Sequence, residues 1–260
     1  MLKKLLKYDI KSLSNTLLPI YGVTLLTALI SVIFQKLEDI TPIFRVPMSL
    51  ITMLAGFLSF GVIIITFIVG IQKYYNQTSK DEGYLIHTLP VKKSNIILSK
   101  ITSQLIFQIL SCIITAASIT IIAQVPLNDI IDAIKELVRL FTDYSSTTFI
   151  IALLVLLVAY ITSTLLIYVS ISFGQKHSNN KIKYSVGYGI LIYIITQILT
   201  ALIYTPLLQN NKFIEELNKT FPSETVLNIT LLIVAGVSTL TSIVYFYLTT
   251  KNLEKKLNLE

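Results

Sequence analysis

Charged residues are scarce in this sequence, and so are cysteine and histidine. Only 13% of the 260 residues are charged, whereas 53% are hydrophobic and the mean hydropathy is +0.74. A soluble domain carries about 25% charged residues, so this chain cannot cover a globule with a solvated surface. The single cysteine, Cys112, excludes an internal disulfide framework and multi-cysteine metal sites, and two histidines leave little for a histidine-based metal centre.

Two further absences concern chemistry. The sequence has no Gly-x-x-x-x-Gly-Lys-Ser/Thr phosphate loop, so any ATP hydrolysis that drives this protein must take place on a separate chain. Its long apolar runs contain no Asp, Glu, Lys, Arg or His. Ion-coupled carriers use buried ionisable residues, and intramembrane metalloproteases need histidine and acidic ligands. We therefore expect a non-catalytic chain that binds no metal or cofactor itself.

Six long uncharged runs remain between the charges. A hydrocarbon core of about 30 Å requires about 20 helical residues, and each run is long enough. The sequence therefore predicts an all-α integral membrane protein with a single transmembrane domain over residues 1–260. The six predicted spans lie near residues 13–35, 46–72, 101–125, 147–173, 185–207 and 225–249.

Basic residues are divided unequally between the two sides of these spans. One side, made of residues 1–11, 73–100, 176–183 and 251–260, holds 15 Lys and Arg and 5 acidic residues. The three remaining loops hold 6 basic and 9 acidic residues. Because Lys and Arg collect in cytoplasmic loops, both termini are predicted to be cytoplasmic, in a multi-pass protein of the plasma membrane. Nineteen Lys against two Arg are in keeping with an AT-rich bacterial genome.

The first eleven residues combine four lysines with apolar residues at helical spacing, namely Leu2, Leu5, Leu6 and Ile10. This pattern predicts a short amphipathic helix on the inner leaflet; a plain positively charged anchor is the alternative. The apolar run that follows is longer than the core of a signal peptide. We therefore expect an uncleaved first span.

Neutral polar residues interrupt several spans. Gln104 and Gln108 are four residues apart and share one face of the third span. Thr162 lies in the fourth span and Gln197 in the fifth. One interpretation is hydrogen bonding between helices, the usual role of such residues in membranes. The other is that these four residues form a weakly polar translocation surface.

The longest positively charged loop, residues 73–100, carries the most informative pattern. Ser79 followed by Glu82 fits a capping box, which predicts a helix start, and Pro90 predicts that this helix ends before it. Gly83 would lie inside the helix and cost about 1 kcal/mol relative to alanine, which is easier to explain if another backbone comes close. Such a helix could fit into a groove of a partner, or lie flat on the membrane.

The middle of this loop reads Asp81-Glu82-Gly83-Tyr84-Leu85-Ile86-His87-Thr88-Leu89-Pro90-Val91, and the next span opens with Ser99-Lys100. This arrangement resembles the permeases of the type-2 ABC transporter family. In that family an acidic residue and a Gly precede Leu and Pro between spans two and three, and a Lys opens span three. The six-span layout, cytoplasmic termini and N-terminal amphipathic helix are similar as well.

The resemblance implies the transmembrane subunit of an ATP-driven exporter, which pairs with itself or with a sister permease. Two ABC-type ATPase subunits, carrying ATP and Mg, would bind at the cytoplasmic face, with no nucleic acid involved. The loop would be the coupling helix, and its implied contact residues are Asp81, Glu82, Gly83, Tyr84, Leu85, His87, Leu89 and Pro90.

Two other functions remain open. A stand-alone membrane protein, such as an immunity or scaffold factor, would share the composition but would not require the loop motif. An ATP-independent carrier would be expected to show buried charges or broken helices in its spans.

Overall fold

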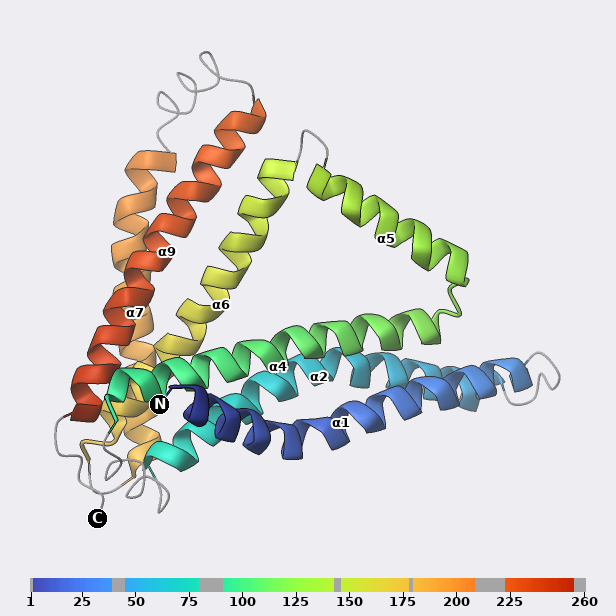
Figure 1. The fold of residues 1–260 in the computed structure, drawn as a ribbon, viewed down its shortest axis with the longest axis horizontal. Coiled ribbons are helices and arrows are strands. Elements are labelled where there is room, and N and C mark those ends of the chain that lie inside the picture. Colours follow the sequence, from blue (N-terminus) through green and yellow to red (C-terminus); the bar gives the residue numbers. More distant parts are fainter. Residues whose placement is uncertain are drawn as a thin grey trace. The chain divides into compact units, whose positions relative to one another are not determined.

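The computed structural model describes residues 2–38, 45–79, 91–142, 146–177, 180–208 and 223–254. These residues are helical apart from short turns, as the sequence predicts. Seven helices are described (Figure 1): α1 (Leu2–Glu38), α2 (Arg45–Ser79), α4 (Lys93–Ile122), α5 (Leu127–Thr142), α6 (Ser146–Gly174), α7 (Lys181–Leu208) and α9 (Ser223–Glu254).

All of these helices except α5 are long and apolar enough to cross a membrane, by length and composition. Within the described residues, the prediction of an all-α protein with six such helices is thereby confirmed. Each predicted span lies within one of them, save for the last three residues of the third. The helix α4 ends at Ile122 because Gln124 adopts a left-handed conformation (φ 50°), and the Val125 amide donates to the Thr120 carbonyl at 3.1 Å.

The helices extend beyond the uncharged runs at several ends. The predicted N-terminal amphipathic segment is the first part of α1, which continues without a break from Leu2 into the first span. Likewise, α2 continues past Lys73 to Ser79. Backbone hydrogen bonding in a helix does not depend on apolar side chains, so the charges that limit a span need not limit the helix.

The described helices pack into two units. The first contains α1, most of α2, α4 and the start of α5. Its core joins three helices through apolar side chains and one buried tyrosine, with Leu13, Leu17 and Tyr21 on α1, Val62 on α2 and Phe107 on α4. The Tyr21 hydroxyl donates to the Phe107 carbonyl at 3.0 Å and lies 3.0 Å from the Thr66 hydroxyl. One side chain thus links α1 to both α2 and α4.

The second unit contains α6, α7, α9 and the rest of α5. In it, α6 packs against both α7 and α9, which scarcely touch each other. Buried residues from α6 and α9 form its core, among them Leu165, Tyr168, Val169, Ala235 and Tyr245. By contrast, none of the residues in the most apolar stretch of α7 is buried. This helix therefore presents most of its surface outward.

Candidate functional site

The predicted ATPase contact lies outside the described residues. This applies to every residue assigned to it, namely Asp81, Glu82, Gly83, Tyr84, Leu85, His87, Leu89 and Pro90. The structure does describe the helices on either side of the loop. On the N-terminal side α2 ends at Ser79, and on the C-terminal side α4 begins at Lys93.

A cluster of polar side chains joins these two helices to α1. The Lys100 ammonium lies 3.3 Å from Asp9 Oδ1, and the two side chains are only 6% and 14% exposed. The Ser99 hydroxyl donates to Asp9 Oδ2 at 2.6 Å. Lys100 also donates to Gln77 Oε1, on the last turns of α2. The ends of α2 and α4 that border the loop are therefore bonded into one cluster with the start of α1.

The positions of these residues explain why the cluster forms. Ser99 and Lys100 are consecutive on α4, so one hydroxyl and one ammonium reach the two oxygens of the same carboxylate. Asp9 is the only acidic residue in the first 37 and lies among four lysines. A charge withdrawn from water needs a partner of opposite sign, and Asp9 supplies it for Lys100.

The sequence pattern pointed to Lys100 only through the family resemblance, and it missed Asp9, Ser99 and Gln77 as members of a cluster. One feature of the sequence could have pointed to Asp9. A single acid within a basic, amphipathic segment is unexpected if that segment serves only to bind an anionic membrane surface. No pattern in the sequence, however, identified its partner 91 residues away.

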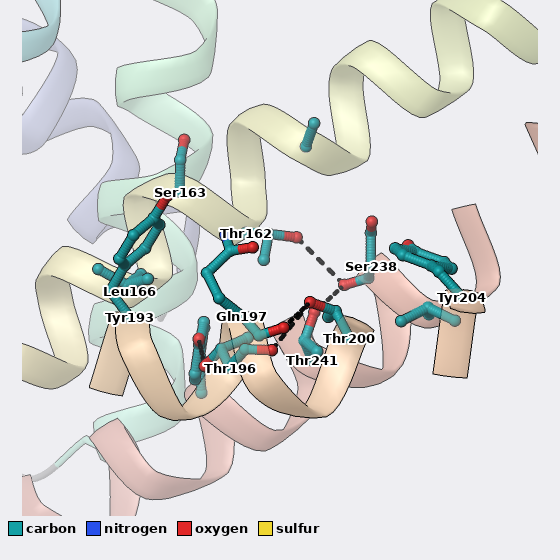
Figure 2. Close-up of a pocket in the computed structure, with 13 residues that line it drawn as sticks. Thr162, Ser163, Leu166, Tyr193, Thr196, Gln197, Thr200, Tyr204, Ser238 and Thr241 are labelled. Atoms are coloured by element: carbon teal, nitrogen blue, oxygen red, sulfur yellow. Dashed lines mark hydrogen bonds between the residues drawn. The ribbon is translucent and has the colours of Figure 1, made fainter. Parts of the chain in front are cut away.

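A second polar site lies in the other unit, between α6, α7 and α9 (Figure 2). It is a pocket of about 310 Å³ lined by 13 residues, of which ten carry a hydroxyl or an amide. Thr162 and Gln197, two of the four residues predicted to form a translocation surface, both line it. The three lining residues without a hydroxyl or an amide are Ala159, Leu166 and Val237. No charged side chain contributes.

Hydroxyl groups of the pocket are bonded largely to helix backbone. The Thr162 hydroxyl lies 2.8 Å from the Val158 carbonyl and 3.1 Å from the Ser238 carbonyl, which joins α6 to α9. Thr196 donates to the Ile192 carbonyl at 2.7 Å and lies 2.5 Å from the Tyr245 hydroxyl, which joins α7 to α9. Hydroxyl oxygens used in this way keep lone pairs that can accept further hydrogen bonds.

Gln197 differs from its neighbours in the pocket. Its side chain is exposed on α7, and no hydrogen bond from its amide is found in the part of the chain that the structure describes. An amide offers two donors and one acceptor. Together with the surrounding hydroxyls, it makes this pocket suited to neutral hydrogen-bonding groups rather than to ions.

Gln104 and Gln108 lie elsewhere, in the contact between α2 and α4 of the first unit. The Gln104 amide donates to the Phe67 carbonyl at 3.5 Å, and the Gln108 amide donates to the Ile63 carbonyl at 3.4 Å. Donors and acceptors are each four residues apart, which forms a ladder between two antiparallel helices. This arrangement favours the helix-packing interpretation for these two glutamines, and it separates them from Thr162 and Gln197.

Within the described ranges, no group of three or more His, Cys, Asp or Glu side chains could hold a metal ion. Comparison of the chain with models of protein families, with curated proteins and with solved structures found no match.

Proposed function

We propose that this chain is the transmembrane permease subunit of a bacterial ATP-driven exporter of the ABC type. In this proposal both termini are cytoplasmic, and the basic start of α1 lies at the inner leaflet. The loop between α2 and α4 contacts a separate ATPase. Six helices able to span a membrane, the unequal distribution of Lys and Arg, and the resemblance of residues 81–91 and 99–100 support this assignment.

The observation that carries the proposal is the cluster of Asp9, Ser99, Lys100 and Gln77. A coupling helix is useful only if movement of the loop is transmitted into the spans. Gln77 lies just before the loop and Lys100 just after it, and both are bonded to the group that includes Asp9 on α1. A force on the loop would therefore act on three helices together rather than on a loose connection.

The pocket of the second unit suggests the kind of substrate. Its lining is largely apolar in surface, carries several hydroxyls and the Gln197 amide, and lacks charge, and a volume of about 310 Å³ lies in the range of small-molecule sites. An uncharged amphipathic molecule, with hydroxyl or carbonyl groups, would fit this chemistry. A second copy of the chain, or a sister permease, would complete the transport pathway.

The decisive experiment is a purification of the tagged protein from its native membranes in a mild detergent. Co-purifying chains are identified by mass spectrometry and assayed for ATP hydrolysis. We expect a stoichiometric ATPase with the wild type and its loss, or loss of coupling, in Gly83→Leu. Gly22→Leu is the control, because Gly22 is exposed and a Cβ there meets no atom within 4 Å.

Two results would count against the permease. The first is a well-folded protein that purifies without any ATPase, which would favour the stand-alone membrane protein. The second is an ATPase that remains bound and fully coupled in Gly83→Leu at equal expression. In that case the loop would not be the coupling element.

A further inference from the structure

The helix α5 is unlike the other described helices. It has 16 residues, from Leu127 to Thr142, and five of them are charged. At 1.5 Å per residue it is about 24 Å long, which is shorter than the hydrocarbon core, and its charges could not be accommodated there. It therefore does not cross the membrane, although it connects two helices that can.

The apolar residues of α5 form one stripe. Ile130, Ile134 and Val138 recur every four residues, and Ile131 lies beside them, so all four project from one side of the helix. Ile131, Ile134 and Val138 are 50%, 57% and 54% exposed. A stripe of large apolar side chains exposed to this extent is suited to an apolar surrounding.

The polar side of α5 has its own partners. Glu136 and Arg139 form an ion pair at 3.5 Å with both side chains about two-thirds exposed (70% and 67%). Such a pair adds little stability in water, but it shows that this side is compatible with solvent. The helix thus has one side suited to water and one suited to hydrocarbon.

The connections of α5 determine where it can lie. Four residues separate it from the end of α4 at Ile122, and three separate it from the start of α6 at Ser146. Fully extended, these connections reach at most about 18 Å and about 14 Å. The first is not extended, because the Val125 amide donates to the Thr120 carbonyl at 3.1 Å. Both ends of α5 are thus held where two membrane spans end.

We infer that α5 is an interfacial helix, with Ile131, Ile134 and Val138 inserted between the lipid headgroups. It would lie on the side of the membrane opposite the N-terminus, because three spans precede it. The interfacial position requires only that α4 and α6 cross the membrane, and the side requires that α1 and α2 cross it as well. Neither depends on the proposed transport function.

The charges on α5 indicate which lipid headgroups it can bind. With three acidic and two basic residues, the helix has no net attraction to anionic lipid. Insertion would be driven by the apolar stripe, as in amphipathic helices generally. We therefore expect the same depth of insertion in vesicles of phosphatidylcholine alone and in vesicles that also contain phosphatidylglycerol.

The absence of tryptophan from the chain makes a direct test possible. A single tryptophan is introduced into the full-length protein on the apolar side (Ile134→Trp or, independently, Val138→Trp) or on the polar side (Glu136→Trp). Each variant is reconstituted into phosphatidylcholine vesicles. Fluorescence is then quenched with lipids brominated on the upper acyl chain and, separately, with aqueous iodide.

We expect blue-shifted emission, strong quenching by brominated lipid and weak quenching by iodide for Ile134→Trp and Val138→Trp. Glu136→Trp should show the reverse. Equal access of iodide to both sides would overturn the inference, since α5 would then stand in water. Blue-shifted emission that brominated lipid does not quench would also overturn it, because protein, such as a second copy of the chain, would then cover the stripe.

Discussion

Removal of the Asp9 charge is the most direct test of the cluster that borders the loop. In Asp9→Asn the side chain keeps its shape and can still accept the Ser99 hydroxyl, so the main change is the loss of the carboxylate 3.3 Å from the Lys100 ammonium. Lys100 retains Gln77 as an acceptor, but it loses the carboxylate that lies 3.3 Å from its ammonium group.

The size of the effect follows from two opposing terms. At 3.3 Å and an effective dielectric constant of about 20, the Coulomb attraction of two unit charges is about 5 kcal/mol. Desolvation of the two ions offsets most of this, so the intact pair contributes little net stability. Loss of one partner of a buried pair costs about 3–5 kcal/mol when the other charge is left without compensation. Because Gln77 remains, we expect a loss near 3 kcal/mol, the lower end of that range.

The assay is unfolding of the purified protein in mixed micelles by increasing SDS, followed by circular dichroism. Asp9→Asn and Lys100→Met are measured singly and together, with Lys11→Met as the control at an exposed lysine. If the pair is real, the double variant loses less than the sum of the single losses, by about 1–3 kcal/mol. Additive losses, to within about 0.5 kcal/mol, would refute the cluster as a coupled unit.

Three further substitutions test helix packing, two in the first unit and one in the second. Gly70→Ala places a Cβ 2.5 Å from Cδ of the buried Gln104, so we expect a net loss of about 1–2 kcal/mol after the helix preference of alanine is counted. Tyr21→Phe removes the hydroxyl that links three helices and should cost about 1 kcal/mol. Gly174→Ala should cost more than Gly70→Ala, because its Cβ would lie 2.7 Å from the Ser185 backbone nitrogen, which cannot rotate away. All are measured by the same SDS titration.

Matched controls exist for these substitutions. A Cβ at Gly56 meets nothing within 4 Å, so Gly56→Ala should be neutral or stabilising. Tyr247 is 59% exposed, and Tyr247→Phe should leave stability unchanged. If Gly70→Ala behaves like Gly56→Ala, the close contact between α2 and α4 is wrong. If Tyr21→Phe behaves like Tyr247→Phe, the hydrogen-bonded link in the first unit contributes nothing.

The spans could be predicted because one physical constraint dominates them. A helix that crosses hydrocarbon must exclude charge over about 20 residues, and this requirement is local in sequence. The ends of the helices are less well determined. Hydrogen bonding continues into the charged segments, as at the start of α1 and the end of α2, while α4 stops at a left-handed residue, Gln124, rather than at a charge.

The partners of polar side chains could not be predicted in the same way. The spacing of Gln104 and Gln108 gave their shared face correctly, but it does not say whether that face meets another helix or a pathway. In the structure that face meets α2, where two backbone carbonyls that are also four residues apart accept from the two glutamines. For Asp9 and Lys100 the partner is 91 residues away, and neither local sequence contains information about the other.

The glutamines of the two units differ in their surroundings, and this contrast bears on function. In the first unit Gln104 is buried and donates to the Phe67 carbonyl of the neighbouring helix α2. In the second unit, α7 has no buried residue in its most apolar stretch, and Gln197 is exposed beside a pocket that carries hydroxyl groups but no charge. An exposed amide in hydrocarbon is costly unless it finds a partner. A lone scaffold in the membrane would gain nothing from that cost, whereas a permease that pairs with another subunit, or receives a neutral substrate at this surface, would use it.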